Sequence, residues 1–472
     1  MRYLTILTIA FTTLLGNGLP ETVLADQTRL PEAVLTEQTR LPETVLADKI
    51  RLPKTLLADK KIQVDAALAT PVMLAEKKQT AYLQVGLIGF RLKKENIAPI
   101  NVALVIDKSG SMQGDKIRRA KKAANMALDL LRKHDIISVI SFDHRVEVLL
   151  PATKATDKEI IHKAINRLRA GGSTALFDGV KKGAQEVRKF LEKDRVNRII
   201  LVSDGKANVG PDSPQELGNL GASLGKEGIA VTTLGLGLGY HEDLMAQLAE
   251  KSDGNHAFIE NATDLARIFK YEFGDLFTVV ATDVNITITC AEGIRPVRVL
   301  GREADIQGQQ VQIVLNQLYS EHQKNVLLEI EVPSTKADQK LTLAKVKTVY
   351  RNMVTDSTDS LTNQVTATFT TSAQRVEEET NAAVMVTALE QLALEKNELA
   401  IKLRDRGKVT EARQVLLDNA ARLKKQAKKY KSELLEKLSD LNRNDAQNLE
   451  DWRRQRKIMR GNIHKRRNYQ TY

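Results

Sequence analysis

Between residues 99 and 275, short apolar runs alternate with stretches in which apolar residues recur every three or four positions. The runs NVALVID, IISVISF, RIILVSD and AVTTLGLG are almost continuously apolar, as in strands buried on both faces of a parallel sheet. The stretches between them have the spacing of amphipathic helices. This alternation predicts an α/β fold with a doubly wound, mostly parallel sheet, which binds ligands at the carboxyl ends of its strands. The expected strands are 101–107, 136–142, 198–204, 230–237 and 256–260, and the expected helices are 115–132, 157–169, 175–193, 213–226, 241–251 and 262–273.

After residue 277 the pattern changes to short segments in which apolar and polar residues alternate. Segments such as VVATDVNITITC, QVQIVLNQL and KNVLLEIEV are separated by turn residues. Residues 278–371 are therefore predicted to form an additional antiparallel β-domain, a sandwich or a barrel. Residues 80–92 alternate in the same way, so we assign residues 78–98 to this β-domain. The α/β domain, residues 99–275, is then an insertion within it.

The last hundred residues lose the strand pattern. Residues 375–402 and 409–441 carry Leu, Ala and Val at helical spacing with charges between them, which predicts two long amphipathic helices. Gly407 is expected to mark the turn between them in a helical tail, residues 374–472. Two arrangements are open: an antiparallel hairpin that resembles one helical repeat, or a solvated pair that packs only on itself.

The first 25 residues have the features of a signal peptide. Arg2 precedes an apolar stretch from Leu4 to Leu15, and the small residues near Ala25 suit cleavage. This predicts export to the periplasm, the cell surface or the medium, with an uncleaved anchor or a cytosolic protein as alternatives. Residues 26–77 are expected to be a linker, because near-copies of the unit LPETVLADQTR fill residues 19–62 and place a Pro at the second position of each copy.

Two features of the composition narrow the partners and the chemistry. The formal net charge is +12, and residues 401–472 hold 21 Lys and Arg against nine Asp and Glu, which is the whole excess. The densest basic segment, WRRQRKIMRGNIHKRR at 452–467, predicts either an anionic partner or a solvated helix end. A polyanion or an anionic membrane surface is favoured over nucleic acid as that partner. Cys290 is the single cysteine, which excludes an intramolecular disulfide and is expected to be a small buried side chain.

Polar side chains that suit a metal ion follow the predicted strands. The loop Asp107-Lys108-Ser109-Gly110-Ser111 comes directly after the first strand, and Asp204 follows the strand at 198–204. Thr174 lies in the Gly-rich loop GGSTALFD, which leads into a helix. Carboxylate and hydroxyl oxygens are hard donors that suit Mg²⁺, Mn²⁺ or Ca²⁺. If the sheet is wound as predicted, these three loops converge on one divalent cation.

In this order and context, the residues Asp107, Ser109, Ser111, Thr174 and Asp204 resemble, position by position, the metal-ion-dependent adhesion site of von Willebrand factor A domains. The resemblance covers residues 99–275. It implies that the three hydroxyls bind one ion, Mg²⁺ first and Mn²⁺ or Ca²⁺ as alternatives, and that the two aspartates act largely through water. One coordination position is then left for an Asp or Glu carboxylate of a protein partner. The β-domain makes the chain look more specifically like bacterial relatives of inter-alpha-trypsin inhibitor heavy chains.

The resemblance implies a cation-dependent module for adhesion or protein interaction, and the N-terminal segment predicts that it is exported. The alternative is an intracellular assembly factor that works with an AAA-type ATPase, which requires that the N-terminal segment does not direct export. Enzyme chemistry is not expected: Ser109 replaces the second carboxylate of an Asp-x-Asp phosphatase. The histidines, His134, His144, His162, His241 and His256 among them, lack zinc-ligand spacing. Asp178 is expected to cap or orient its loop, and Lys108 and Lys206 to face solvent.

Overall fold

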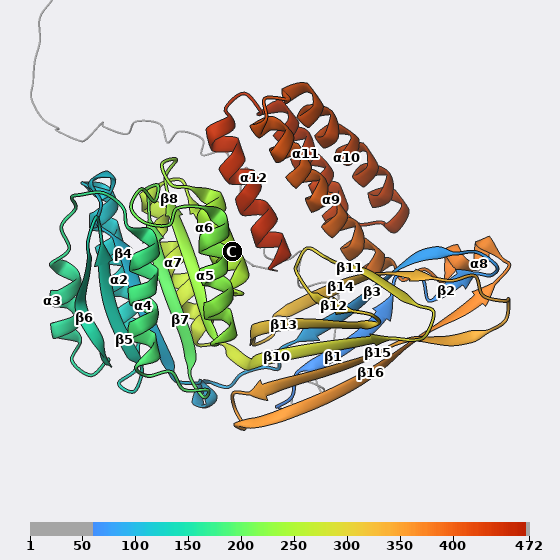
Figure 1. Cartoon of the computed structure of the whole chain (residues 1–472), viewed down its shortest axis with the longest axis horizontal. Helices are drawn as coiled ribbons and strands as arrows, with labels where there is room; N and C mark the ends of the chain where they lie inside the picture. The colour runs from blue at the N-terminus through green and yellow to red at the C-terminus, as the bar shows by residue number, and fades with distance from the viewer. Residues whose placement is uncertain (1–59, 469–472) are drawn as a thin grey trace, which may run out of the picture. The chain divides into compact units, whose positions relative to one another are not determined.

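The computed structural model describes residues 60–468. The predicted signal peptide and all but the last residues of the eleven-residue repeats lie outside this range. Figure 1 shows the described chain as an α/β part, a β part and a group of C-terminal helices. No helix in residues 60–468 is long and apolar enough to cross a membrane.

The α/β domain is built on a six-stranded sheet in the order β6-β5-β4-β7-β8-β9. Neighbouring strands are parallel, except that β6 pairs with β5 in the antiparallel direction. The predicted doubly wound, mostly parallel sheet is thus confirmed, but β6 was missed. Only Leu150 of its residues is fully buried, so this edge strand carries little apolar signal. The strands are β4 Ile100–Asp107, β5 Ile136–Phe142, β6 Val146–Lys154, β7 Val196–Ser203, β8 Ile229–Leu236 and β9 His256–Ile259.

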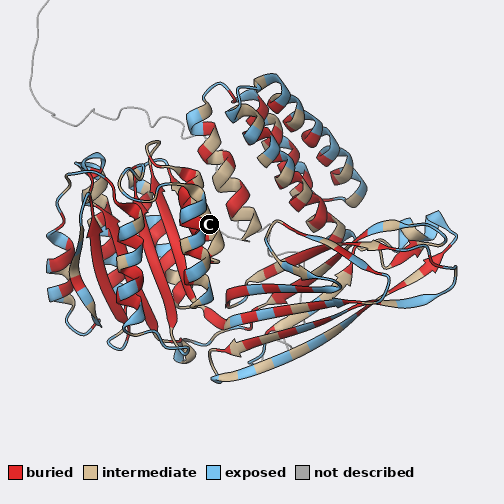
Figure 2. Cartoon of the chain, viewed as in Figure 1, coloured by how far each residue is buried: buried red, intermediate tan, exposed pale blue. Residues whose placement is uncertain are grey.

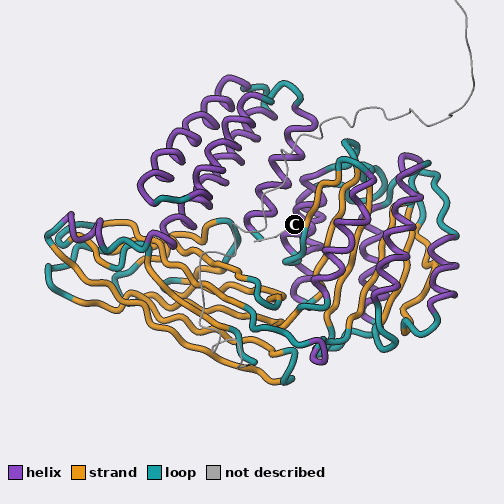
Figure 3. Tube along the Cα trace, turned by 180° about the vertical axis from the view of Figure 1, so that it is seen from behind, coloured by secondary structure: helices purple, strands orange, loops and turns teal. Residues whose placement is uncertain are grey.

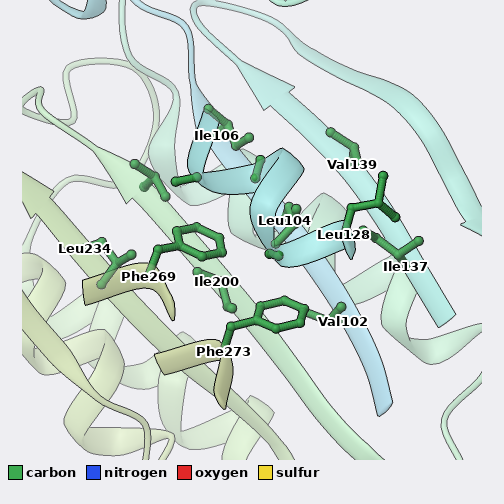
Figure 4. Packing of buried hydrophobic residues seen from close by; sticks show 14 of the residues in the cluster. Val102, Leu104, Ile106, Leu128, Ile137, Val139, Ile200, Leu234, Phe269 and Phe273 are labelled. Carbon is green, nitrogen blue, oxygen red and sulfur yellow. The ribbon is translucent and has the colours of Figure 1, made fainter. Parts of the chain in front are cut away.

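Helices cover both faces of this sheet. Along β4, Val102, Leu104 and Ile106 pack toward one face, whereas Ala103 and Val105 pack toward the other, so the whole strand is buried. This explains its continuous apolar run. Figure 4 shows the first face, where Phe269 and Phe273 lie over the strands, and Figure 2 shows the strands as buried along their length. The first face is covered by α2 Asp115–Leu130, α3 Lys158–Asn166 and α7 Leu265–Leu276, and the second by α4 Leu176–Arg188, α5 Pro214–Lys226 and α6 Glu242–Lys251.

The β-domain is a sandwich of two sheets, β1-β3-β14-β11 and β12-β13-β10-β15-β16-β2, whose inner faces share one apolar core. Strand β3 pairs along its whole length with β14, from Gln79 opposite Val332 to Ile88 opposite Gln323. The chain therefore enters the sandwich before the α/β domain and returns to it afterwards. The strands are β1 Gln63–Leu68, β2 Val72–Leu74, β3 Gln79–Ile88, β10 Val279–Cys290, β11 Arg295–Leu300, β12 Asp305–Gln307, β13 Gln310–Tyr319, β14 Gln323–Val332, β15 Lys340–Asn352 and β16 Ser357–Thr370.

The end of the predicted linker, residues 63–77, is part of this sandwich, so the boundary at residue 77 was wrong. Strands β1 and β2 are edge strands, and β2 pairs with β16, almost three hundred residues later in the chain. Such pairing is non-local and leaves no repeating pattern in the short segment itself. Cys290 is buried at the end of β10, as expected, and burial raises the pKa of its thiol to about 11.

The tail forms five helices, α8 Ala373–Glu378, α9 Ala382–Asp405, α10 Val409–Tyr430, α11 Glu433–Gln447 and α12 Trp452–Arg467. Gly407, with φ of 79°, lies in the turn between α9 and α10, as predicted. The prediction of a single helix over 409–441 was wrong. Lys431 takes a left-handed conformation, with φ of 47°, and Ser432 accepts a hydrogen bond from the Leu435 amide as the N-cap of α11. Figure 3 shows the separate helices.

Helix α12 contacts the α/β domain, so the alternative of a solvated helix end for residues 452–467 was wrong. Val384 and Ala388 of α9 pack against the sandwich, so the alternative of a helical pair that packs only on itself was wrong too. Arg454 pairs with Glu260 at 2.6 Å, and Arg456 pairs with Glu242 at 2.5 Å. Lys457 also pairs with Glu242 and donates to the Tyr240 carbonyl at 2.9 Å. The charges that predicted an external polyanion or membrane partner for residues 452–467 are thus largely paired with carboxylates of the chain itself. No local pattern could show this, because these carboxylates lie about two hundred residues earlier in the sequence.

Candidate metal centre

The candidate metal residues lie at the carboxyl ends of two adjacent parallel strands. Asp107 is the last residue of β4, and Asp204 follows the last residue of β7. Ser109 and Ser111 lie in the loop after β4, where residues 110–112 form a single turn of 3-10 helix. Thr174 lies two residues before the start of α4. The three predicted loops therefore reach the same edge of the sheet.

Backbone hydrogen bonds fasten these loops to one another. The Gly110 amide donates to the Gly172 carbonyl at 2.9 Å, and the Gly171 amide donates to the Lys108 carbonyl at 2.7 Å. The third loop is held by Asn208, whose Oδ1 accepts from the Thr174 amide at 2.8 Å. The oxygen donors are thus supported by a fixed backbone frame, as a preorganised ion site requires.

The side-chain oxygens form a connected group. Ser109 Oγ lies 3.1 Å from Ser111 Oγ, and Ser111 Oγ donates to Asp204 Oδ1 at 2.7 Å. A Cβ placed on Gly205 would lie 3.0 Å from Thr174 Oγ1 and 3.4 Å from Asp107 Oδ2, so these two oxygens face the same small space. The structure brings all five predicted residues to the same edge of the sheet, and a side chain at position 205 would press on Thr174.

The two carboxylates are buried: Asp107 is 0% exposed and Asp204 is 1% exposed. Burial raises the pKa of Asp107 to about 6, against the lowering effect of hydrogen bonds from Ser109 and Ser203. The nearby charge of Asp204 raises it further. A buried carboxylate that is costly to ionise favours a nearby positive charge. Together with the hydroxyls, this donor set fits a hard divalent cation.

Three residues around the site were not predicted from the sequence. Ser203 Oγ donates to Asp107 Oδ2, and Asn208 positions Thr174 as described. Lys116, in the first turn of α2, donates to Asp204 Oδ2. Ser203 is the polar residue that ends the apolar run from Ile199 to Val202 in β7, which is a usable signal. The pairing of Lys116 with Asp204 has no such signal, because the two residues are 88 positions apart.

The other polar residues singled out from the sequence lie outside the oxygen group. Asp178 is in the first turn of α4, and Lys206 is exposed as expected. Lys108 was expected to face solvent, but its side chain is only 19% exposed and lies 3.4 Å from both Asp143 and Glu147. His256 is buried beside Thr233 and Tyr240, and His241 caps α6. In residues 60–468 no group of three or more His, Cys, Asp or Glu is arranged to hold a metal.

Fold and site together define the class of the central domain: a doubly wound α/β domain that gathers oxygen donors at the strand ends, where such domains bind ligands. Residues 101–270 match the family model of the von Willebrand factor type A domain, and this part of the chain belongs to that family. The resemblance predicted from the sequence is thereby confirmed.

Relatives of this domain occur in proteins of different kinds. The uncharacterized protein sll0103 of Synechocystis sp. is 35% identical over 193 residues, which are 41% of this chain and 45% of that protein. The inter-alpha-trypsin inhibitor heavy chain H2 of Mus musculus is 29% identical over 203 residues, 40% of this chain and 21% of that protein. The matched region therefore spans less than half the length of these curated relatives.

Two solved structures share the fold over most of the chain. A von Willebrand factor type A protein from Catenulispora acidiphila has a TM-score of 0.63 at 15% identity and covers 76% of this chain and 87% of its own. The ArnB paralog VWA2 from Sulfolobus acidocaldarius has a TM-score of 0.60 at 18% identity and covers 86% of this chain and 97% of its own. At these identities the likeness shows the fold alone.

Proposed function

We propose that this protein is a non-enzymatic, exported interaction module that binds an acidic residue of a protein partner through a divalent cation. The observation that carries the proposal is the group of oxygen-bearing side chains from three loops, in which Ser111 joins Ser109 to Asp204, and Thr174 and Asp107 both lie beside Gly205. Membership in the von Willebrand factor type A family supports it, since these domains commonly serve in protein interaction.

Each residue has a distinct part in this proposal. Ser109, Ser111 and Thr174 supply neutral hydroxyl oxygens directly to the cation, which is Mg²⁺ first, with Mn²⁺ or Ca²⁺ as alternatives. Asp204 holds the Ser111 hydroxyl, and Asp107 holds the backbone amide of Ser109, through hydrogen bonds. The bound cation supplies a positive centre with one open position for a partner's Asp or Glu carboxylate. Ser111 is exposed, so the partner approaches the site from its side.

The proposal includes no catalytic step, because the enzyme alternative considered for Asp107, that of a phosphoacceptor, lacks its second carboxylate. Asp107 accepts hydrogen bonds from the Ser109 amide and the Ser203 hydroxyl, and its carboxylate is buried. In an Asp-x-Asp phosphatase the phosphoacceptor is followed two residues later by a second carboxylate, where this chain has Ser109. The residues present serve binding rather than group transfer.

Calorimetric titration of the full chain with Mg²⁺ tests the proposal. Asp107→Ala and Thr174→Ala are expected to abolish binding while the thermal transition and circular dichroism stay those of a folded protein. Asp194→Ala removes an exposed carboxylate from the same domain and serves as the matched control, with unchanged affinity. Equal Mg²⁺ affinity in the two site variants and the unchanged chain would refute the site.

Two further measurements address the partner and the compartment. Capture of partners from native extract is expected to be lost on chelation and restored by Mg²⁺. Fractionation of the native cells is expected to place the protein outside the cytoplasm, in keeping with the apolar stretch from Leu4 to Leu15. Recovery in the cytoplasm together with an ATPase would contradict export and support an intracellular assembly factor.

A further inference from the structure

Lys116 is a charged residue beside the candidate metal centre that the five-residue motif does not include. Its Nζ donates to Asp204 Oδ2 and also to the Ser111 carbonyl at 3.3 Å. The Lys116 side chain is 35% exposed, whereas the Asp204 side chain is 0% exposed. One end of this ion pair therefore lies within the site, and the other lies where a partner approaches.

The position of Lys116 in its helix is unfavourable for a cation. It is the second residue of α2, where the aligned peptide dipoles place partial positive charge and an acidic residue is preferred. No requirement of helix α2 accounts for a lysine there. Its contacts with Asp204 and Ser111 do account for it, because both belong to the oxygen group.

The pairing of Lys116 with Asp204 changes the net charge of the site. Asp107 and Asp204 contribute two negative charges to the site, and Lys116 contributes one positive charge. Of the other charged groups nearby, Lys108 pairs with Asp143, and Asp115 pairs with Arg118 and Arg119, whereas Lys206 is exposed. A divalent cation would leave the two aspartates alone with no net charge, but it leaves the group that includes Lys116 with a net charge of plus one.

We infer that Lys116 is the residue that makes the cation-loaded site select an anionic ligand, a carboxylate of an acidic peptide, over a neutral oxygen ligand. This inference rests on the proposed function and deepens it. Lys116 weakens binding of the cation through repulsion, and strengthens binding of the carboxylate through attraction. The two effects have opposite signs, which a residue that merely supports the fold does not produce.

The test uses the full chain with Mn²⁺ as the cation and acetate as the carboxylate probe. Mn²⁺ affinity is measured by calorimetry, and acetate binding by the loss of water-proton relaxation as bound water is displaced from Mn²⁺. In Lys116→Met we expect about tenfold or more tighter Mn²⁺ binding and about tenfold or more weaker acetate binding, since a unit charge acts at close range in a partly screened site. Lys116→Gln provides a second neutral variant, and thermal melting checks that each variant is folded.

Two controls separate charge from shape. Lys116→Arg keeps the charge and is expected to retain both affinities within a few-fold. Lys122→Met removes the same charge from an exposed position on the same helix and is expected to change neither affinity.

Unchanged acetate affinity in the Met and Gln variants, or an Arg variant that behaves like them, would overturn the inference while Mn²⁺ binding upheld the proposed function. Absence of Mn²⁺ binding in the unchanged chain would overturn the proposed function and this inference with it.

Discussion

Arg198 of β7 and Tyr319 of β13 join the two domains through a hydrogen bond of 2.7 Å that is closed to solvent. Arg198 is 0% exposed and also donates to Gln317 in the β-domain and to Thr232 in the α/β domain. A buried guanidinium is costly unless its donors are satisfied by fixed partners. This residue therefore couples the sheet that carries the candidate metal centre to the sandwich.

Replacing Arg198 tests this coupling. Arg198→Met is expected to lower the free energy of unfolding by about 3 kcal/mol or more, because the buried neutral acceptors around it lose their donor, at about 1–3 kcal/mol each. Tyr319→Phe removes the hydrogen bond from Arg198 and the longer one to Gln317, and is expected to cost about 1 kcal/mol. Urea unfolding followed by circular dichroism measures both. A loss below about 1 kcal/mol for Arg198→Met would contradict the assigned role.

The pairing of α12 with the α/β domain can be tested by its local opening. Arg456 contacts Glu242 and Asp243 of α6 and Asp405 of α9, with its side chain 18% exposed. Arg456→Ala is expected to increase amide hydrogen exchange throughout α12 by at least tenfold, since three carboxylates lose their shared partner. Lys402→Ala, at an exposed position on α9, is the control. Unchanged exchange in α12 would contradict this role of Arg456 and would show that the other contacts of the helix, such as those of Arg454 and Lys457, hold it without Arg456.

The α/β domain was predictable because its central strands are buried on both faces, and such strands are apolar at nearly every position. The edge strand β6 is not so buried, and only Leu150 among its residues is fully enclosed. The end of α10 at Tyr430 lacked a Gly or Pro signal, since the left-handed residue is Lys431. The contact of α12 with the α/β domain could not be predicted, because it depends on Glu242 and Glu260, which no local pattern connects to α12.

The residues of the candidate site also fall into those that the sequence could predict and those that it could not. Asp107, Thr174 and Asp204 could be proposed because each follows a strand or precedes a helix in a recognisable loop. Lys116 could not be assigned, because its contact with Asp204 depends on how the first turn of α2 lies over the adjacent strand end. Motif position indicates which residues supply oxygens, and only the three-dimensional arrangement shows which charges surround them.

Asp445 predicts a loss of stability as the pH rises. Burial raises its pKa to about 7, against the lowering effect of a hydrogen bond from Gln455. Because the folded-state pKa exceeds the unfolded value, the folded protein binds the proton more tightly. The associated stability is present below about pH 4 and is lost as the pH rises to about 7. Asp445→Asn is expected to remove this dependence and to be the more stable protein at pH 8, by up to about 4 kcal/mol. Parallel urea curves at pH 5 and pH 8 measure the difference, and an equal pH response of the two proteins would contradict it.

His464 of α12 and His256 of β9 predict a loss of stability as the pH falls, which is opposite to the effect of Asp445. Their rings lie edge to face, 5.7 Å apart, where the helix meets the α/β domain. Burial lowers the pKa of His464 to about 4 and that of His256 to about 3, and each ring is further disfavoured as a cation by nearby positive charges. Folded-state pKa values below the unfolded value mean that stability is full above about pH 6.5 and is lost as the pH falls toward about 3.

His464→Gln cannot take up the proton, so the difference in unfolding free energy between it and the unchanged chain should shift in favour of the variant as the pH falls from 7 to 4. Because Asp445 is present in both proteins, its contribution cancels in this comparison. A difference that stays constant across this range would mean that His464 is already solvated, and that α12 does not close over β9 as the structure shows.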